Sequence, residues 1–294
     1  MKNFLITGAS GFIGNNFLKN FSNKKNYYYI FLKSSKKNKK FKNSFKDKNK
    51  KFIFFKRNSE IYASINKLKI NFFINFATHY TRNNDFKNTE QLIKSNILFP
   101  SLILESINKK YLKKVITFGS MQEHHQNKEY MPDCLYAATK KSLDKLFFFH
   151  KIKLTKIKFY NLKFYETYNA NDKRKKLIPI IKKNYINNLT TNLASKTLNL
   201  NFLHVDDVCR AINIIINKNI KSGEYQIQAK KFSNPKKLID KFNKKNFKKI
   251  KYITTNNNIF NINYNLNKLP YWKQTINIEN NFNHFLNENY KNKI

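Results

Sequence analysis

The fold is decided by the stretch Thr7-Gly8-Ala9-Ser10-Gly11-Phe12-Ile13-Gly14, whose three glycines stand three residues apart. It lies between an apolar run at residues 4–6, predicted as a strand, and an amphipathic segment at residues 12–21, predicted as a helix. The first glycine permits a tight turn, the second lets backbone approach a pyrophosphate, and the third lets the helix pack against the strand. Free N–H groups at the helix start would hold the phosphates. An ordinary turn is the alternative, but this context favours a dinucleotide site built from Gly8, Ser10, Gly11, Phe12, Ile13 and Gly14.

Strand and helix signals alternate from this turn to about residue 165, which is typical of a parallel sheet covered on both faces. The predicted fold is therefore α/β, a Rossmann-type doubly wound parallel sheet. Residues 33–51 are dominated by Lys, Asn and Ser and are predicted as a solvated loop. We expect further strands at 27–32, 52–55, 71–76, 115–118 and 157–164, and helices at 89–108 and 135–151.

The strand signals become sparser beyond residue 165. We expect residues 1–165 to form an NAD(P)-binding Rossmann domain, and residues 166–294 a smaller C-terminal α/β lobe that binds substrate. Some strands and helices of the second part are expected to return to the first. The Asn-rich residues 256–267 are predicted as loop, and residues 278–290 have helical spacing.

The net charge of +41, from 58 Lys and Arg against 17 Asp and Glu, is compatible with a nucleic-acid or anionic-membrane partner. Only four of these residues are arginine, the better fork for phosphates and base edges. The lysines are spread along the chain with abundant Asn, Phe and Ile, which share A/T-rich codons, so base bias explains most of the charge. We predict no specific nucleic-acid partner.

The remaining composition places the chain among globular cytoplasmic proteins. No apolar run approaches the roughly 20 residues of a membrane span, so we predict no membrane insertion. The cysteines, Cys134 and Cys209, form no motif. The histidines lack metal-ligand spacing, and we predict no metal site.

The end of the second predicted strand indicates which dinucleotide binds. An acid there accepts from the 2′-hydroxyl of NAD, whereas basic residues accommodate the 2′-phosphate of NADP. This chain has Lys33 and Ser34 and no acid before Asp47. The missing acid favours NADPH and leaves NAD possible.

A catalytic constellation follows in the middle of the chain. Tyr136 and Lys140 stand at i and i+4 of a predicted helix and share one face. A neighbouring ammonium favours the phenolate and brings the pKa of the phenol toward a range useful for proton transfer. Ser120 follows the predicted strand at 115–118, at the sheet edge where ligands of such folds collect. We predict Ser120, Tyr136 and Lys140 as catalytic residues, with Tyr136 and Lys140 also contacting the cofactor.

Together these motifs resemble the extended short-chain dehydrogenase/reductase family of nucleotide-sugar epimerases, dehydratases and reductases. The segments Phe202-Leu203-His204-Val205-Asp206-Asp207-Val208 and Gly223-Glu224-Tyr225-Gln226-Ile227 continue the resemblance. It implies cofactor contacts from Ala77 and Asn96. It also implies a homodimer formed through the helices at 89–108 and 135–151.

A closer resemblance, to CDP-abequose and CDP-paratose synthase-like ketoreductases, lies in Gly119-Ser120-Met121-Gln122-Glu123-His124-His125 and in residues 129–140 and 161–179. Asn169 stands where the family usually has glycine. The resemblance implies a nucleotide-diphosphate sugar as substrate, in deoxysugar and O-antigen biosynthesis. The candidate substrate contacts are His79, Gln122, His124, Tyr165 and Arg174.

Three chemistries share this scaffold. A 4,6-dehydratase resembling known members needs an Asp-Glu pair after the catalytic hydroxyl, and here Met121 and Gln122 follow Ser120. A 4-epimerase retains NAD and usually shows the missing ribose-binding acid. NADPH-dependent reduction of a 4-keto-deoxyhexose on a nucleotide diphosphate is therefore the leading hypothesis. The alternatives are an NAD-dependent nucleotide-sugar 4-epimerase and, from another class, a non-catalytic RNA-binding protein of the same fold.

Overall fold

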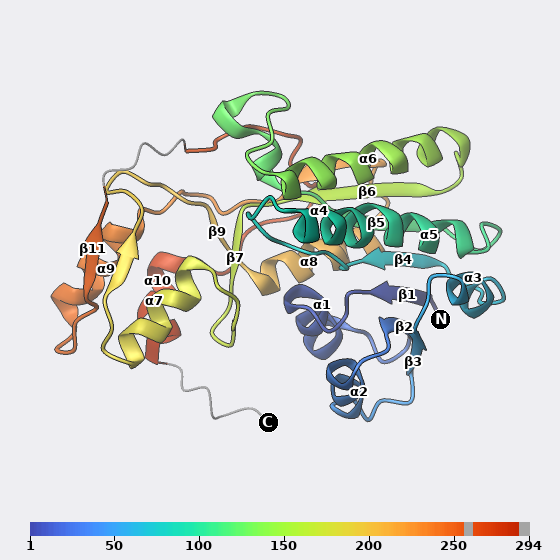
Figure 1. Ribbon diagram of the computed structural model, residues 1–294, viewed down its shortest axis with the longest axis horizontal. Helices are drawn as coiled ribbons and strands as arrows, with labels where there is room; N and C mark the ends of the chain where they lie inside the picture. The colour runs from blue at the N-terminus through green and yellow to red at the C-terminus, as the bar shows by residue number, and fades with distance from the viewer. Residues whose placement is uncertain (256–260, 288–294) are drawn as a thin grey trace.

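The computed structural model describes residues 1–255 and 261–287, and its centre is a seven-stranded parallel sheet (Figure 1). The strand order is β10-β6-β5-β4-β1-β2-β3. The chain starts at β1, moves outward to β3, returns beside β1 as β4, and continues to the opposite edge. This confirms the predicted doubly wound sheet. Its strands are β1 (Asn3–Thr7), β2 (Tyr27–Lys33), β3 (Lys50–Phe55), β4 (Phe72–Asn75), β5 (Lys114–Phe118), β6 (Lys158–Lys163) and β10 (Gly223–Gln226).

Helices cover both faces of the sheet because its strands carry apolar side chains on both sides. One core joins the sheet to α1, the π-helical turn η1 and α8; the other joins it to α3, α5 and α6. The predicted helix at 89–108 forms as three consecutive pieces, α4, η2 and α5. The bounds are α1 (Phe12–Asn16), η1 (Phe17–Phe21), α3 (Glu60–Ile65), α4 (Phe86–Ile93), η2 (Lys94–Leu98), α5 (Phe99–Ser106), α6 (Leu135–Lys153) and α8 (Val205–Asn217).

A smaller group of elements with its own apolar core lies beside the carboxyl end of the sheet, at the left of Figure 1. Two parallel strand pairs, β7–β9 and β8–β11, belong to this part of the chain. β10 joins the main sheet although it lies beyond residue 165. The division of the chain at residue 165 into two domains remains a prediction. The bounds are β7 (Glu166–Tyr168), β8 (Thr191–Leu193), β9 (Phe202–His204), β11 (Tyr252–Thr254), α7 (Leu177–Ile186), α9 (Pro235–Lys245) and α10 (Ile278–Asn287).

The predicted loop at residues 33–51 is wrong, because it contains helix α2 (Lys36–Asn43). Ser35 caps its start by accepting a hydrogen bond from the Asn38 N–H, and Phe41 packs against Phe52 of β3. One cap and one aromatic anchor thus hold a helix whose composition is almost wholly polar.

Two expectations near the C-terminus lie partly outside the described residues. Residues 256–260 and 288–290 are not described, whereas 261–267 form neither helix nor strand, and α10 ends at Asn287. Within the described residues, no helix is long and apolar enough to cross a membrane.

Candidate active site

A cavity of about 2620 Å³ runs along the carboxyl ends of the strands. Pockets for drug-sized ligands occupy roughly 300–1,000 Å³, so this cavity has room for more than one such molecule. Its walls come from the glycine turn, from the ends of β2, β4 and β5, and from residues 164–176.

The glycine turn has the geometry that its spacing predicts. Gly8 has φ of +66°, and a Cβ atom there would lie 2.2 Å from the backbone nitrogen of Ala77. A Cβ on Gly14 would lie 2.7 Å from the carbonyl oxygen of Gly8. β1, β4 and the first helix therefore meet without side chains between them. The turn fits a pyrophosphate, because backbone N–H groups at the helix start border an open cavity.

At one end of the cavity lie the side chains that would meet an adenosine ribose. Lys33, Lys37 and Arg57 line this end. Asn38 joins the glycine turn to β2: it accepts a hydrogen bond from Ser10 (Oγ to Oδ1, 2.9 Å) and donates one to the Lys33 carbonyl (2.7 Å). Among the described residues 34–58, which follow β2 directly, none that lines the cavity is a carboxylate. Ser34 is not among the lining residues.

The predicted catalytic residues all border the same cavity. Tyr136 and Lys140 project from the first two turns of α6, with the Lys140 Nζ 6.0 Å from the centre of the Tyr136 ring. Ser120 begins the short 3-10 helix η3 (Met121–Glu123), and its Oγ accepts a hydrogen bond from the Gln122 N–H. The cap uses an acceptor site of the Ser120 hydroxyl, so the O–H remains a donor.

The pKa of Tyr136 differs from the sequence-based expectation. Burial raises the pKa of the phenol above its ordinary value, while a hydrogen bond with Thr78 opposes the rise only in part. Burial lowers the pKa of Lys140 to about 8, and Glu123 opposes this by favouring the cation. The expected lowering of the tyrosine pKa by Lys140 is therefore wrong, because desolvation is the largest cause of the shift and it raises the pKa. The phenol is protonated at neutral pH, which is the form of a proton donor.

Asn96 holds the loop that follows β4. Its side chain accepts from the His79 N–H (2.7 Å) and the Thr78 hydroxyl (3.1 Å). It donates to the His79 carbonyl and to the Thr139 hydroxyl, each at 3.0 Å. Asn96 is buried and is not a lining residue. It thus joins Thr78 and His79 to Thr139 of the helix that carries Tyr136. Ala77, which precedes them, lines the cavity.

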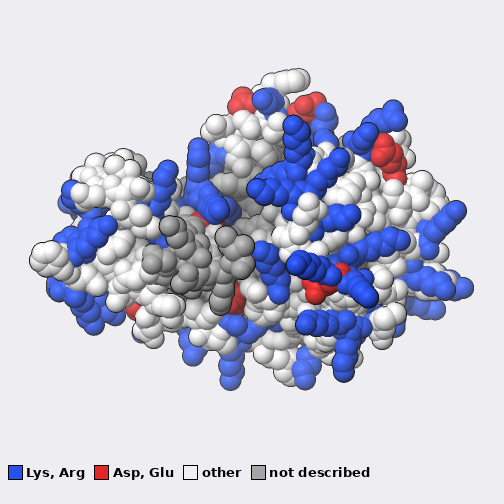
Figure 2. Space-filling model, turned by 90° about the horizontal axis from the view of Figure 1, so that it is seen from below, with Lys and Arg blue, Asp and Glu red and all other residues white. Residues whose placement is uncertain are grey.

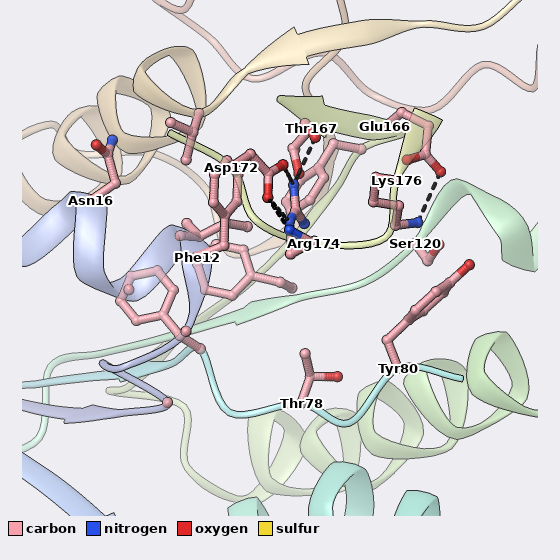
Figure 3. Close-up of a pocket in the computed structure, with 18 of the residues that line it drawn as sticks. Phe12, Asn16, Thr78, Tyr80, Ser120, Glu166, Thr167, Asp172, Arg174 and Lys176 are labelled. Atoms are coloured by element: carbon pink, nitrogen blue, oxygen red, sulfur yellow. Dashed lines mark hydrogen bonds and ion pairs between the residues drawn. The ribbon is translucent and has the colours of Figure 1, made fainter. Parts of the chain in front are cut away.

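Arg174 lies over the glycine turn (Figure 3). Its guanidinium binds both carboxylate oxygens of Asp172 at 2.7 and 2.9 Å, and donates to the Thr167 carbonyl at 2.7 Å. Its central carbon stands 3.7 Å from the centre of the Phe12 ring. The cation therefore borders the cavity where the cofactor turn meets the second part of the chain.

The other predicted substrate contacts divide into two groups. Gln122 and Tyr165 line the cavity, but His79 and His124 do not. His79 lies behind the cavity wall, where Asn96 binds its backbone. His124 is buried and stacks on Tyr264, with ring centres 4.2 Å apart. Burial lowers the pKa of its imidazole.

Comparison with known proteins agrees with this arrangement. The NAD dependent epimerase/dehydratase family matches residues 4–227, which is most of the chain. The chain belongs to this family. It is an enzyme of the extended short-chain dehydrogenase/reductase type.

Three similar proteins are named for activities on nucleotide-linked sugars. CDP-abequose synthase of Salmonella muenchen is 25% identical over 231 residues, covering 77% of this chain and 74% of the relative. UDP-glucuronic acid 4-epimerase of Bacillus cereus, with NAD bound, superposes with a TM-score of 0.79 at 15% sequence identity. The match covers 97% of this chain and 98% of the epimerase. dTDP-glucose 4,6-dehydratase of Bacillus anthracis, with NAD bound, superposes with a TM-score of 0.77 at 18% sequence identity. The match covers 97% of this chain and 96% of the dehydratase. The structural likenesses show the shared fold.

In this epimerase/dehydratase-family enzyme, Tyr80 and Lys176 are among the lining residues that the sequence analysis did not predict. The Tyr80 ring meets the Tyr136 ring edge-on at 4.8 Å, and the Lys176 Nζ lies 4.1 Å above Tyr80. Lys176 also pairs with Glu166 at 3.1 Å (Figure 3). Tyr80 lies shortly after β4, where ligands of such folds collect, and that position was a usable signal. Lys176 is hidden in a run of four basic residues.

Proposed function

We propose that this enzyme reduces the ketone of a 4-keto-deoxyhexose carried on a nucleotide diphosphate, with NADPH as reductant. The observation that carries the proposal is one continuous cavity. It joins the glycine turn, a basic end without a carboxylate after β2, and the residues Ser120, Tyr136 and Lys140. Similarity to a CDP-abequose synthase supports the same class of substrate. Such a product would serve deoxysugar and surface-polysaccharide biosynthesis.

The chain's own residues supply orientation and the proton. When bound, NADPH supplies a hydride to the carbonyl carbon. Ser120, whose Oγ already accepts one hydrogen bond from its cap, donates its O–H to the carbonyl oxygen and polarises the bond. Tyr136 donates its phenolic proton to that oxygen as negative charge develops. Lys140 binds the cofactor ribose and stabilises the resulting phenolate, and the net reaction takes up one proton from solvent.

The turn after β5 supports reduction over dehydration. Elimination of water by the dehydratases that this chain resembles requires an Asp-Glu pair after the catalytic hydroxyl. Here Met121 and Gln122 both line the cavity, and Met121 is buried. Neither side chain is an acid or a base, so we do not propose elimination.

The cofactor that the purified protein retains separates reduction from epimerisation. An epimerase keeps NAD through both half-reactions, and the NAD bound to the UDP-glucuronic acid 4-epimerase favours this second candidate. We expect protein purified without added cofactor to lack NAD and to bind NADPH more tightly than NADH. Lys33→Asp should reverse that order, because an acid accepts from the ribose hydroxyl and repels a 2′-phosphate. Tightly held NAD in the wild-type protein would favour the epimerase.

The rival class, an RNA-binding protein of this fold, would use the basic surface. Figure 2 shows Lys and Arg side chains spread over the whole visible face instead of gathered into one stripe. A nucleic-acid footprint is a localised basic patch, so we propose no specific nucleic-acid partner. Salt-dependent RNA binding in the absence of any NADPH binding would support the rival.

We also propose that the enzyme is a homodimer. The family resemblance assigns the contact to the helices at residues 89–108 and 135–151. These helices expose large apolar side chains, which soluble monomers seldom gather in one region. The most exposed are Ile93, Leu98, Leu146, Phe148 and Phe149, and Ile152 follows them in the last turn of α6.

A further inference from the structure

Behind Ser120 lies an ion pair that is completely removed from solvent. Glu123 ends the short helix η3, and Lys163 is the last residue of β6; both side chains are 0% exposed. Glu123 Oε2 and Lys163 Nζ are 2.9 Å apart. Glu224 of β10 approaches the same ammonium at 2.6 Å. Buried charges of this kind persist only when they are paired.

The pair continues into a network that reaches the catalytic helix. Lys141, the neighbour of Lys140 in α6, lies 3.2 Å from Glu224. Asp144, one turn further along α6, accepts a hydrogen bond from the Asn161 side chain of β6 at 2.9 Å. The network therefore ties the turn after β5 to β6, β10 and the helix of Tyr136.

Within this network, Glu123 and Glu224 stabilise the cation of Lys163, whereas Glu224 and Asp144 repel each other. Burial opposes the cation of Lys163, but Glu123 and Glu224 outweigh it and raise the pKa of the ammonium. Burial, a hydrogen bond with Glu224 and repulsion from that carboxylate together raise the pKa of Asp144 to about 7. Lys163 thus remains a cation between two carboxylates at neutral pH.

Glu123 connects the network to Ser120. Its Oε1 accepts a hydrogen bond from the Ser120 backbone N–H at 2.9 Å, while the Ser120 Oγ accepts from the backbone of η3. This is a reciprocal capping box. The residue before Ser120 is also tightly packed against the ion pair. A Cβ on Gly119 would lie 2.8 Å from Cγ of Lys163 and 3.0 Å from Oε1 of Glu123.

A buried ion pair is weak evidence of a contribution to the stability of the fold. Replacing a buried ion pair by well-packed apolar side chains is often neutral or stabilising. The capping box of Ser120 and Glu123 could also form without a buried lysine beside Glu123. What the ion pair adds is a fixed position for the Glu123 carboxylate, and hence for the peptide that carries the Ser120 hydroxyl.

We propose that Glu123, held by Lys163, is a positioning residue that orients Ser120 toward the reacting carbonyl. The role rests on the proposed ketone reduction, since it acts through the hydroxyl that polarises the substrate. Glu123 also exerts charge on Tyr136 and Lys140. The test must therefore separate an effect through Ser120 from a direct electrostatic one.

A double-mutant cycle on the reductase separates these routes. We expect Glu123→Leu to lower kcat by about tenfold or more with little change in KM, because misplacement of a catalytic group affects the chemical step. In a Ser120→Ala background the same change should lower kcat by less than about twofold, since the group it positions is gone. Glu123→Gln, whose amide oxygen can still accept from Ser120, should recover most of the activity. Glu129→Leu, an exposed acid on the same loop, is the matched control.

A result that overturns the proposal is an equal loss in both backgrounds, which would indicate a direct effect of charge. An unchanged kcat in Glu123→Leu would overturn it as well. If Glu123→Leu does not fold, the charge-neutral pair Glu123→Leu with Lys163→Met takes its place.

Amide hydrogen exchange gives a readout that needs no substrate. In the wild-type protein the Ser120 amide should exchange slowly, because it is bound to a buried carboxylate. Glu123→Leu should accelerate it by about tenfold or more, with β5 and β6 unaffected. Unchanged exchange at Ser120 would overturn the proposal. If the wild-type enzyme reduces no nucleotide-linked ketosugar while Glu123→Leu still accelerates exchange at Ser120, the proposed function alone is refuted.

Discussion

In the proposed reduction, one phenol supplies the proton. Tyr136 borders the cavity, and loss of water around it raises its pKa, so that it is protonated when a ketone arrives. A neutral donor whose neighbour Lys140 can stabilise the phenolate is suited to the reduction of a carbonyl. The same pair would work in reverse only after the phenol had lost its proton.

Tyr136→Phe tests that role without disturbing the packing of the cavity. Removing the hydroxyl should lower kcat by about 10²–10⁴-fold, the usual contribution of a positioned acid. NADPH binding should remain nearly intact, because the ring is retained. Steady-state kinetics with fluorescence titration of NADPH measure both quantities. Ketosugar reduction at nearly the wild-type rate would remove Tyr136 from the mechanism.

Lys140 predicts a second, thermodynamic effect. Its side chain is buried, and its pKa falls from 10.5 to about 8 on folding. Below about pH 8 the folded protein therefore holds an unfavourable buried cation, and this penalty disappears as the pH rises toward 10.5. Lys140→Met should raise the free energy of unfolding at pH 7 by on the order of 3 kcal/mol, while abolishing reduction.

Urea unfolding of the cofactor-free wild type and variant at several pH values measures that difference. Because every other group titrates in both proteins, the gap between them reports Lys140 alone. The gap should close between about pH 8 and 10.5. A pH-independent gap, or a wild type that is the more stable at pH 7, would contradict the assigned cause.

The residues of the site differ in how well their positions could be predicted from the sequence. The positions of Ser120, Tyr136 and Lys140 at the cavity could be predicted. Ser120 follows a predicted strand, and the other two residues share one face of a predicted helix. Tyr80 had a signal in its position shortly after β4, but its contact with the Tyr136 ring is seen only in the folded loop. Lys163 had a signal, since a charged residue in a strand covered on both faces is unusual. Its partner Glu224 lies 61 positions away and is brought to it only by the pairing of β10 with β6.

At the scale of elements, the glycine turn controls the site because it lets β1 and β4 approach each other. Gly8→Ala should destabilise the fold by on the order of 3 kcal/mol or more and prevent NADPH binding, since the methyl group would overlap backbone at a positive φ. Denaturant unfolding and NADPH titration measure the two effects. Gly223→Ala is the control, because the nearest atom to its Cβ is 3.9 Å away. Equal behaviour of the two variants would refute the argument from close approach.

Helix α2 shows where prediction of elements failed. A segment of Lys, Asn and Ser has no helical apolar stripe, so periodicity favoured a loop. The helix forms because Ser35 caps it and Phe41 finds Phe52 on β3, a contact that exists only once the sheet has formed. It matters for function, since Asn38 of this helix joins the glycine turn to the end of β2.

For the whole molecule, the charge of +41 is a property of the surface more than of the site. Lysines cover the visible face in Figure 2 without forming a stripe. Both proposed ligands are polyanions, so the field aids their approach. Lys33 and Arg174 line the cavity, and we expect the selectivity for these ligands to rest on a few residues of this kind.

The exposed apolar side chains on α4–α6 predict how two molecules meet. Phe149→Glu combined with Ile152→Glu should raise the dimer dissociation constant by about 100-fold or more, because charges would enter an apolar contact. Sedimentation velocity over a range of concentrations measures this change. Phe247→Glu, a fully exposed aromatic outside these helices, should leave the dimer intact. A wild-type protein that is monomeric at micromolar concentration would contradict the proposed dimer.

The central claim is a net reduction at the sugar carbonyl, and transfer of deuterium tests it most directly. The purified enzyme is given a nucleotide-linked 4-keto-deoxyhexose and NADPH carrying deuterium at the hydride position. We expect one NADPH to be oxidised for each sugar consumed, with the deuterium on the former carbonyl carbon of the product. Interconversion of sugar epimers without net cofactor oxidation, and without label in the product, would contradict the reductase and support an epimerase.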